Sequence, residues 1–161
     1  MFSLFGKKKK EATLASPANG ELVLLETVSD PVFAQKVMGD GYAVIPADGN
    51  IVMPADGTVT SIFPTKHAIG LLLENGLELL VHMGVETVAL KGAPFEIFVE
   101  ENQKVKAGDA LAKMDLELLA KEEKDHTIML ILTNGDEVAS FEVNAPGTVS
   151  AGEEIGKAVK K

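Results

Sequence analysis

Cysteine is absent from the sequence, and so is tryptophan. Without cysteine the chain can form no disulfide bond and has no thiolate chemistry, which fits a reducing compartment. Long hydrophobic runs are also missing: no apolar stretch approaches the roughly 20 residues that are needed to span a bilayer. The sequence therefore gives no transmembrane segment and no redox centre built on sulfur.

Positive charge is in short supply as well, because the formal net charge is −9. Affinity for nucleic acid depends on neutralising phosphates with Lys and Arg, so nucleic acid is not an expected partner. A surface this acidic suits protein partners with basic docking faces. Long-range electrostatic attraction would increase the rate at which such partners associate. The 161 residues, of which 46% are hydrophobic and 24% charged, are enough for one domain with a core and a polar surface.

The first ten residues, MFSLFGKKKK, place apolar residues before a run of lysines. A signal peptide has its charges first and then a longer apolar stretch, so this segment does not fit one. Two interpretations stay open: a flexible solubilising tail, and a weak anchor to anionic lipid at the inner face of the plasma membrane. We expect residues 1–15 to form this tail and residues 16–161 to form the domain.

Short apolar segments separated by turn signals follow one another along the rest of the chain. The expected strands are 21–28, 42–46, 49–53, 57–63, 67–73, 77–83, 95–99, 110–114, 127–133, 138–142, 147–149 and 156–159. Residues 116–124 have helical spacing with Asp115 as the N-cap, and 32–38 could form one helical turn or an irregular connector. This pattern predicts an all-β domain, an antiparallel sandwich or barrel-like fold with Greek-key or jelly-roll connections and at most short helices.

A predicted hairpin carries a histidine near each of its ends, in HAIGLLLENGLELLVHMG at residues 67–84. Asn75-Gly76 between two apolar runs is a strong hairpin signal, because both residues tolerate the positive φ of a type I′ turn. A two-residue loop there predicts that His82 lies opposite Ile69. His67 and His82 then lie on one face, about 7–8 Å apart at the backbone. A bulge at the turn would change this register.

Three chemistries use two neighbouring imidazoles, and a purely structural pair is the alternative. A zinc site typically has three or four protein ligands, and no third is obvious here. Acid–base hydrolysis needs a nucleophile or activated water with an orienting carboxylate, which nothing local supplies. Phosphoryl transfer needs one imidazole as nucleophile and a second that donates to the phosphoryl oxygens. The sequence has no Walker-type loop or kinase motif, so phosphate would arrive from another protein rather than from ATP.

Five motifs in order carry a family resemblance. They are SDPVFAQKVMGDG at 29–41, PADGTV at 54–59, TKHA at 65–68, LVHMG at 80–84 and ETVALKG at 86–92. With them the chain resembles the glucose-type enzyme IIA family of the bacterial phosphoenolpyruvate-dependent sugar phosphotransferase system, from about residue 16 to the C-terminus. The resemblance implies an antiparallel β-sandwich with a shallow apolar depression around the two histidines.

The resemblance also implies a role for each site residue. His82 would accept phosphate on Nε2 from the phosphocarrier HPr and pass it to the IIB domain of a sugar permease. His67 would contact the phosphoryl group, Thr65 would orient His67, and the Gly84 carbonyl would hold His82 Nδ1.

A partner-binding rim is implied as well. Phe33 and Phe63 would form its apolar part, although each could instead be a plain core residue. Asp30 and Glu86 would flank it with negative charge. The family commonly has Asp where Glu86 stands, so the charge is kept on a longer side chain.

We expect a freestanding cytoplasmic carrier, monomeric, with no dissociable cofactor and no required metal. His67 and His82 could serve as zinc ligands when a partner supplies a carboxylate. In some members the unphosphorylated form also binds regulated permeases or metabolic enzymes.

Other classes of β protein fit the sequence less well. Biotinyl and lipoyl carrier domains need a modified Lys at a hairpin tip, and the candidate tip, Asn75-Gly76, has none. A zinc peptidase on a related β fold would need an additional His-x-His pair, which this sequence does not contain. A metal-binding or structural protein without phosphoryl chemistry remains an alternative.

Overall fold

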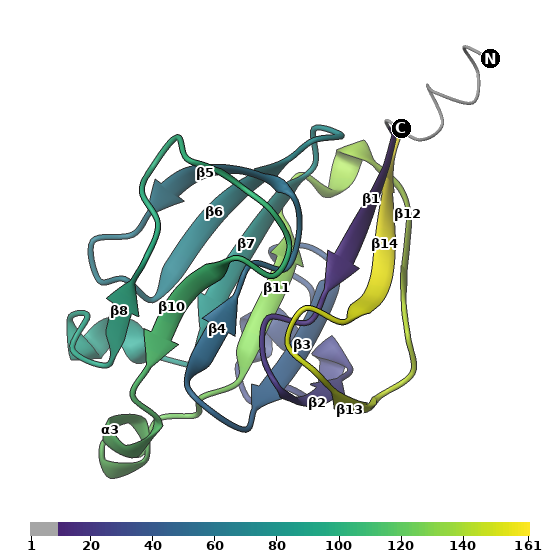
Figure 1. Cartoon of the computed structure of the whole chain (residues 1–161). Helices are drawn as coiled ribbons and strands as arrows, with labels where there is room; N and C mark the ends of the chain where they lie inside the picture. Colours follow the sequence, from purple (N-terminus) through teal and green to yellow (C-terminus); the bar gives the residue numbers. More distant parts are fainter. Residues whose placement is uncertain (1–9) are drawn as a thin grey trace.

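An eight-stranded antiparallel sheet runs through the centre of the computed structural model, which describes residues 10–161 (Figure 1). The strand order is β13-β2-β3-β11-β7-β6-β5-β9. The bounds are β2 Gly20–Val23, β3 Gly41–Pro46, β5 Gly57–Ile62, β6 Ala68–Leu73, β7 Glu78–Met83, β9 Lys104–Val105, β11 Ile128–Leu132 and β13 Gly147–Val149.

Two three-stranded antiparallel sheets pack against one face of this large sheet. One has the order β1-β14-β12, with bounds Glu11–Ala15, Glu154–Lys160 and Val138–Val143. The other has the order β4-β10-β8, with bounds Asn50–Val52, Ala110–Met114 and Phe95–Ile97. Helices are short: α2 Pro31–Ala34, α3 Leu116–Lys121 and the 3-10 turns η1 Leu25–Thr27, η2 Thr87–Leu90 and η3 Gly135–Glu137. The predicted all-β antiparallel sandwich is therefore confirmed.

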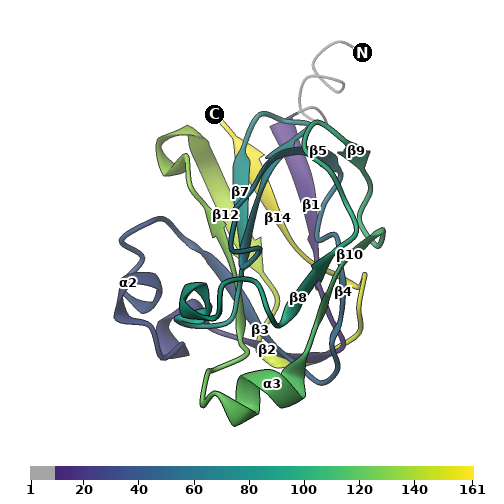
Figure 2. The ribbon, with the colours of Figure 1, turned by 90° about the vertical axis from the view of Figure 1, so that its left-hand side faces the viewer.

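The large sheet is apolar on both faces at its centre. Along β11, Ile128 and Leu130 belong to the main core, which the small sheets cover, whereas Met129 and Ile131 belong to a second apolar cluster on the opposite face. Because successive side chains of a strand point to opposite faces, burial on both sides explains the uninterrupted sequence IMLIL. The second cluster is covered by η1 and α2, which lie on the opposite side of the sheet from β8, β10 and β4 (Figure 2).

The helix predicted after residue 115 is present and begins as expected. The Asp115 carboxylate accepts a hydrogen bond from the amide of Leu118, which satisfies one of the free N–H groups of the first turn. The helix ends at Lys121 rather than at residue 124. The segment 32–38 contains the single turn of α2, capped by Asp30 with Pro31 in the first helical position.

The strand predicted over residues 21–28 is too long. The chain leaves the sheet after Val23 and turns at η1, where the Thr27 hydroxyl donates to the carbonyl of Leu24 at 2.6 Å. Leu25 then packs on the second cluster. Apolar residues within a sheet and apolar residues that cover it are of the same types. The apolar sequence of residues 21–28 therefore could not show where the strand ends and the covering segment begins.

The tail expected over residues 1–15 is wrong for residues 11–15, which form β1 and pair with β14 at the other end of the sequence. Leu14 is fully buried in the main core. Asn75 Nδ2 donates to the carbonyls of Lys10 and Ala158, at 2.8 and 3.2 Å, and so joins the start of β1 and the end of β14 to the β6–β7 turn. The membrane-contact hypothesis concerns residues 1–10, and residues 1–9 lie outside the described part. From residue 10 onward, the structure contains no helix with the length and apolar character to cross a bilayer.

The hairpin predicted at Asn75-Gly76 forms, but its register is shifted by one residue. His82 lies opposite Ala68, not Ile69, because the turn holds three residues rather than two. The carbonyl of Leu73 accepts from the amide of Gly76 at 2.9 Å, and Gly76 has φ +94°. This is the bulged turn that a positive φ at the third loop position produces.

The central position of β11 predicts a large stability cost for truncating one of its side chains. Leu130 is 0% exposed, and Leu130→Ala should lower the free energy of unfolding by about 2–5 kcal/mol because it leaves a cavity. Leu72→Ala is the control, since Leu72 is 40% exposed on a neighbouring part of the sheet, and should cost less than about 1 kcal/mol. Equal losses in urea titrations of the two variants would contradict this account of the core.

Candidate active site

His82 lies near the end of β7, on the face of the large sheet that carries the second cluster. The strand alternation that buries Val81 and Met83 in the main core turns His82 to this other face. Its ring centroid is 4.8 Å from that of Phe33, at an interplanar angle of 55°. The imidazole is thus half-buried against an apolar surface and open on its remaining side.

A backbone carbonyl fixes the tautomer of His82. Its Nδ1 is 2.9 Å from the carbonyl oxygen of Gly84. A carbonyl can only accept, so Nδ1 carries the hydrogen and Nε2 carries the lone pair when the ring is neutral. The ring therefore presents a nucleophilic nitrogen away from the strand end.

Gly84 can hold this carbonyl in place only as a glycine. Its φ is +81°, and a Cβ atom there would come within 2.4 Å of Thr87 Cγ2 and 2.9 Å of the Asp125 carbonyl oxygen. Two hydrogen bonds fix the surrounding turn: the buried Thr87 hydroxyl donates to the Met83 carbonyl at 2.7 Å, and the Gly84 amide donates to the Thr127 carbonyl at 2.9 Å. The glycine is needed for both conformation and space.

His67 lies just before β6, and its ring approaches that of His82. The two centroids are 5.0 Å apart and the ring planes are at 76°. Alternation along a strand would put residue 67 on the opposite face from Ala68, but the chain turns at Lys66, where φ is 58°, before the strand begins. Because His67 lies in this bend and not in β6, strand alternation does not fix its side chain, and the two rings meet despite the shifted register.

The other contacts of His67 leave one ring nitrogen for chemistry. Its Nδ1 is hydrogen bonded to the Thr65 hydroxyl, and the ring of Phe63 packs edge-on at 5.5 Å. The residue is only 8% exposed. With Nδ1 engaged on both histidines, the two Nε2 atoms are the ring nitrogens without a protein partner among the described residues.

The surroundings keep both imidazoles uncharged at neutral pH. Burial, together with the nearby charge of His67, lowers the pKa of His82 from 6.5 to about 4, against the opposing effects of the Gly84 carbonyl and Asp30. Burial also lowers the pKa of His67. Because the unfolded chain would protonate His82 near its ordinary value, the site costs no stability at pH 7, and stability falls as the pH drops from 6.5 towards 4.

The predicted rim residues lie around the pair in different ways. Phe33 is buried in the second cluster and contacts His82, whereas Phe63 is 39% exposed beside His67. Asp30 caps α2 and is close enough for its charge to act on His82. Glu86 is exposed, in a left-handed conformation, with its carboxylate 3.8 Å from Lys124 Nζ.

Three polar residues that support the site were not singled out from the sequence: Thr87, Asp125 and Thr127. Each acts through the backbone around Gly84 and none touches a ring. In the sequence, Asp125 and Thr127 are marked only by a short Asp-x-Thr pattern before β11, and Thr87 only by its place in the ETVALKG motif.

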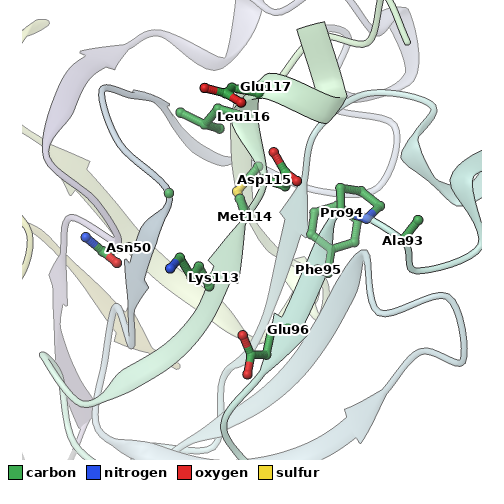
Figure 3. A pocket seen from close by; sticks show the side chains of 11 residues that line it. Asn50, Ala93, Pro94, Phe95, Glu96, Lys113, Met114, Asp115, Leu116 and Glu117 are labelled. Atoms are coloured by element: carbon green, nitrogen blue, oxygen red, sulfur yellow. The ribbon is translucent and has the colours of Figure 1, made fainter. Parts of the chain in front are cut away.

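One surface pocket lies away from the histidines. It has a volume of about 560 Å³ and is formed by the ends of β8 and β10 and the start of α3, with Pro94, Phe95, Lys113 and Leu116 in its wall (Figure 3). None of its lining residues belongs to the histidine site. Within residues 10–161, no group of three or more His, Asp or Glu side chains is arranged to hold a metal ion.

Comparisons with known proteins agree on one family. The model of the phosphoenolpyruvate-dependent sugar phosphotransferase system, EIIA 1 family, matches residues 12–138. The PTS system glucose-specific EIIA component of Staphylococcus epidermidis is 45% identical over 153 residues, which are 93% of this chain and 92% of that protein. The PTS system glucose-specific EIICBA component of Streptococcus pneumoniae is 51% identical over 142 residues, 88% of this chain but only 20% of that longer protein. The solved glucose permease IIA from Mycoplasma capricolum superimposes with a TM-score of 0.83 at 34% identity, covering 92% of this chain and 96% of that one.

The low pKa of His82 predicts a titration that NMR can follow. Its ring C–H signals should stay at the neutral position on acidification and move with a midpoint near pH 4. His67→Ala should raise this midpoint, because it exposes the ring and removes the neighbouring charge. His126→Ala identifies the signals of the third histidine, and a His82 midpoint that is already near 6.5 in the wild type would contradict the burial described here.

The geometry at Gly84 predicts that Gly84→Ala destabilises the fold and releases the His82 ring. Strain at the positive φ together with the contact to Thr87 should cost about 1–3 kcal/mol. The control is Gly108→Ala, because Gly108 has φ +92° but nothing within 4 Å of a Cβ atom. Urea titrations and ¹⁵N spectra of the ring should show the larger stability loss, and the loss of the single tautomer, for Gly84→Ala alone.

Proposed function

The chain belongs to the EIIA 1 family of the phosphoenolpyruvate-dependent sugar phosphotransferase system, and on that premise we propose that it carries a phosphoryl group on Nε2 of His82. The observation that supports this most directly is the hydrogen bond of His82 Nδ1 to the Gly84 carbonyl. It leaves an unprotonated Nε2 on a ring that is neutral at pH 7.

In the proposed reaction His82 attacks the phosphohistidine of the phosphocarrier HPr. The Nε2 lone pair forms the new N–P bond in line, while the N–P bond in the donor breaks and the donor nitrogen keeps that electron pair. A partner docked over the apolar cluster beside the ring would exclude water during transfer, which protects the reactive bond from hydrolysis. Transfer onward to the IIB domain of a glucose-type permease repeats the step with His82 as the leaving group.

His67 is proposed to stabilise the charge on the transferring group. When the Thr65 hydroxyl donates to His67 Nδ1, the hydrogen of the neutral ring is on Nε2, the nitrogen without a protein partner. That N–H can donate to a phosphoryl oxygen as the new bond forms. Thr65 then acts by fixing the tautomer of its neighbour.

The rim around the pair is proposed as the docking face for both protein partners. Exposed apolar side chains occur beside the site and on the elements next to it: Phe63 against His67, Val32 in α2 and Val88 in η2. Asp30 and Glu86 would attract basic groups on HPr and on the IIB domain, in line with the net charge of −9. Docking supplies the binding energy that aligns the phosphorus between the two histidines.

The proposal also covers the location of the protein, its oligomeric state and its further binding partners. The carrier acts in the cytoplasm as a monomer, with residues 1–10 as a candidate for weak contact with anionic membrane. The unphosphorylated form could bind regulated permeases or metabolic enzymes. The histidine pair could also bind zinc when a partner supplies a carboxylate.

The proposal predicts a specific labelling pattern. With phosphoenolpyruvate, enzyme I and HPr, the wild type should gain one acid-labile phosphoryl group by intact mass, and His82→Ala should gain none. His67→Ala should be labelled but fail to pass the label to a IIB domain, because the phosphoryl charge is no longer stabilised during transfer.

The control is His126→Ala, which should behave as the wild type does. An unlabelled wild type in a mixture where HPr is fully phosphorylated would show that His82 is not a phosphoryl acceptor from HPr.

A further inference from the structure

A single carboxylate joins the two walls of the His82 site. Asp125 lies in the loop between α3 and β11, far along the sequence from both histidines. Its two oxygens accept hydrogen bonds from two different parts of the fold: Oδ1 from Thr127 and Oδ2 from Ser29. The Ser29 bond joins residues 96 positions apart in the chain.

The first connection runs to the Gly84 turn. Asp125 Oδ1 accepts from the Thr127 amide at 2.8 Å and from its hydroxyl at 2.7 Å, which fixes the backbone of residues 125–127. The carbonyls of Asp125 and Thr127 in turn accept the amides of Val85 and Gly84, each at 2.9 Å. The carboxylate thus orients the peptide whose carbonyl holds His82 Nδ1.

The second connection runs to the segment that covers the second cluster. The Ser29 hydroxyl donates to Asp125 Oδ2 at 2.8 Å. The next residue, Asp30, caps α2 by accepting from the amide of Val32 at 2.9 Å. This short helix carries Phe33, whose ring packs on His82. The carboxylate therefore also anchors the wall opposite Gly84.

The hydrogen bonds keep Asp125 ionised. Burial would raise the pKa of its carboxyl, but the bonds from Thr127 and Ser29 outweigh burial and hold the pKa below its ordinary value. A charged acceptor makes stronger bonds to all three donors than a neutral one would.

We propose that Asp125 is a positioning residue for phosphoryl transfer at His82, because it holds the Gly84 carbonyl and the Phe33 wall in register on either side of the ring. Its kinetic consequences rest on the proposed function, whereas its effect on the His82 ring does not. Asp125 touches neither histidine ring and acts only through Thr127, Gly84 and Ser29.

Four variants separate this role from general stability. Asp125→Ala removes both connections. Asp125→Asn keeps them, because its amide oxygen can accept from Thr127 and its amide nitrogen can donate to the Ser29 hydroxyl. Ser29→Ala removes only the connection to the Phe33 wall. Asp48→Ala is the matched control, since Asp48 accepts in the same way from the Asn50 amide at 2.9 Å and from Asn19 Nδ2 at 3.2 Å, without a contact to the site.

The first measurement is the ¹⁵N NMR spectrum of the His82 ring in the unphosphorylated protein. Wild type, Asp48→Ala and Asp125→Asn should each show one tautomer with hydrogen on Nδ1. Asp125→Ala should show mixed tautomers and faster exchange of that hydrogen.

The second measurement is the rate of transfer from phospho-HPr. This rate should fall roughly tenfold or more for Asp125→Ala. It should stay within about threefold of wild type for Asp125→Asn and for Asp48→Ala. For Ser29→Ala, the KM for phospho-HPr should rise with little change in kcat.

The outcomes are distinct. A folded Asp125→Ala with the ring spectrum and rates of Asp48→Ala would overturn the proposal. If Asp125→Ala does not fold, an unchanged KM for Ser29→Ala would overturn it instead. If the wild type takes no phosphate at all, the proposed function fails, and the ring spectra alone decide whether Asp125 positions His82.

Discussion

The hydrogen bond from His82 Nδ1 to the carbonyl of Gly84 is the constraint on which the site depends. To direct one carbonyl at the ring of a residue two positions back, the chain must turn sharply at the end of β7. That turn needs a positive φ, room that only glycine leaves, and partners for the amides of Gly84 and Val85. The polar residues around it, Thr87 and Thr127 among them, are explained by this need. In return, the ring has one tautomer and one free nitrogen.

The large sheet supplies the setting for this bond. Its main core, between the eight-stranded sheet and the two small ones, contains most of the buried side chains. The opposite face is covered only in part, by η1 and α2, so a half-buried ring can lie there beside exposed apolar side chains. A site on this face uses little of the core, and a docking partner can complete the burial of the cluster.

The sequence predicted those features that depend on local pattern or on residue type. The apolar run of β11, the N-cap at Asp115 and the hairpin at Asn75-Gly76 could all be identified because each is encoded within a few residues. Proximity of the two histidines was also predicted, although the register was off by one residue. The rings meet because His67 lies in a bend before β6, where strand alternation does not apply.

The sequence did not predict features that depend on distant partners. Strand β1 exists because β14 pairs with it from the other end of the chain. The chain leaves the sheet after Val23 because there is an apolar cluster for Leu25 to cover. The sequence does not distinguish Asp125 from other polar loop residues, because its partner Ser29 is far away in the sequence and only the fold brings the two together. Local composition carries no information about any of these pairings.

The pairing of β1 with β14 has a geometric consequence for how the domain can be attached to other chains. The start of β1 and the end of β14 lie beside the β6–β7 turn (Figure 1), where Asn75 Nδ2 donates to the carbonyls of Lys10 and Ala158. His82 lies at the other end of β7, roughly 15 Å away at about 3.3 Å per residue. A tether that continues directly from the start of β1 or from the end of β14 would therefore leave the domain at the end remote from the histidines. In the longer relative the matched segment is only 20% of the protein, and this placement of the two strand ends is compatible with such an attachment.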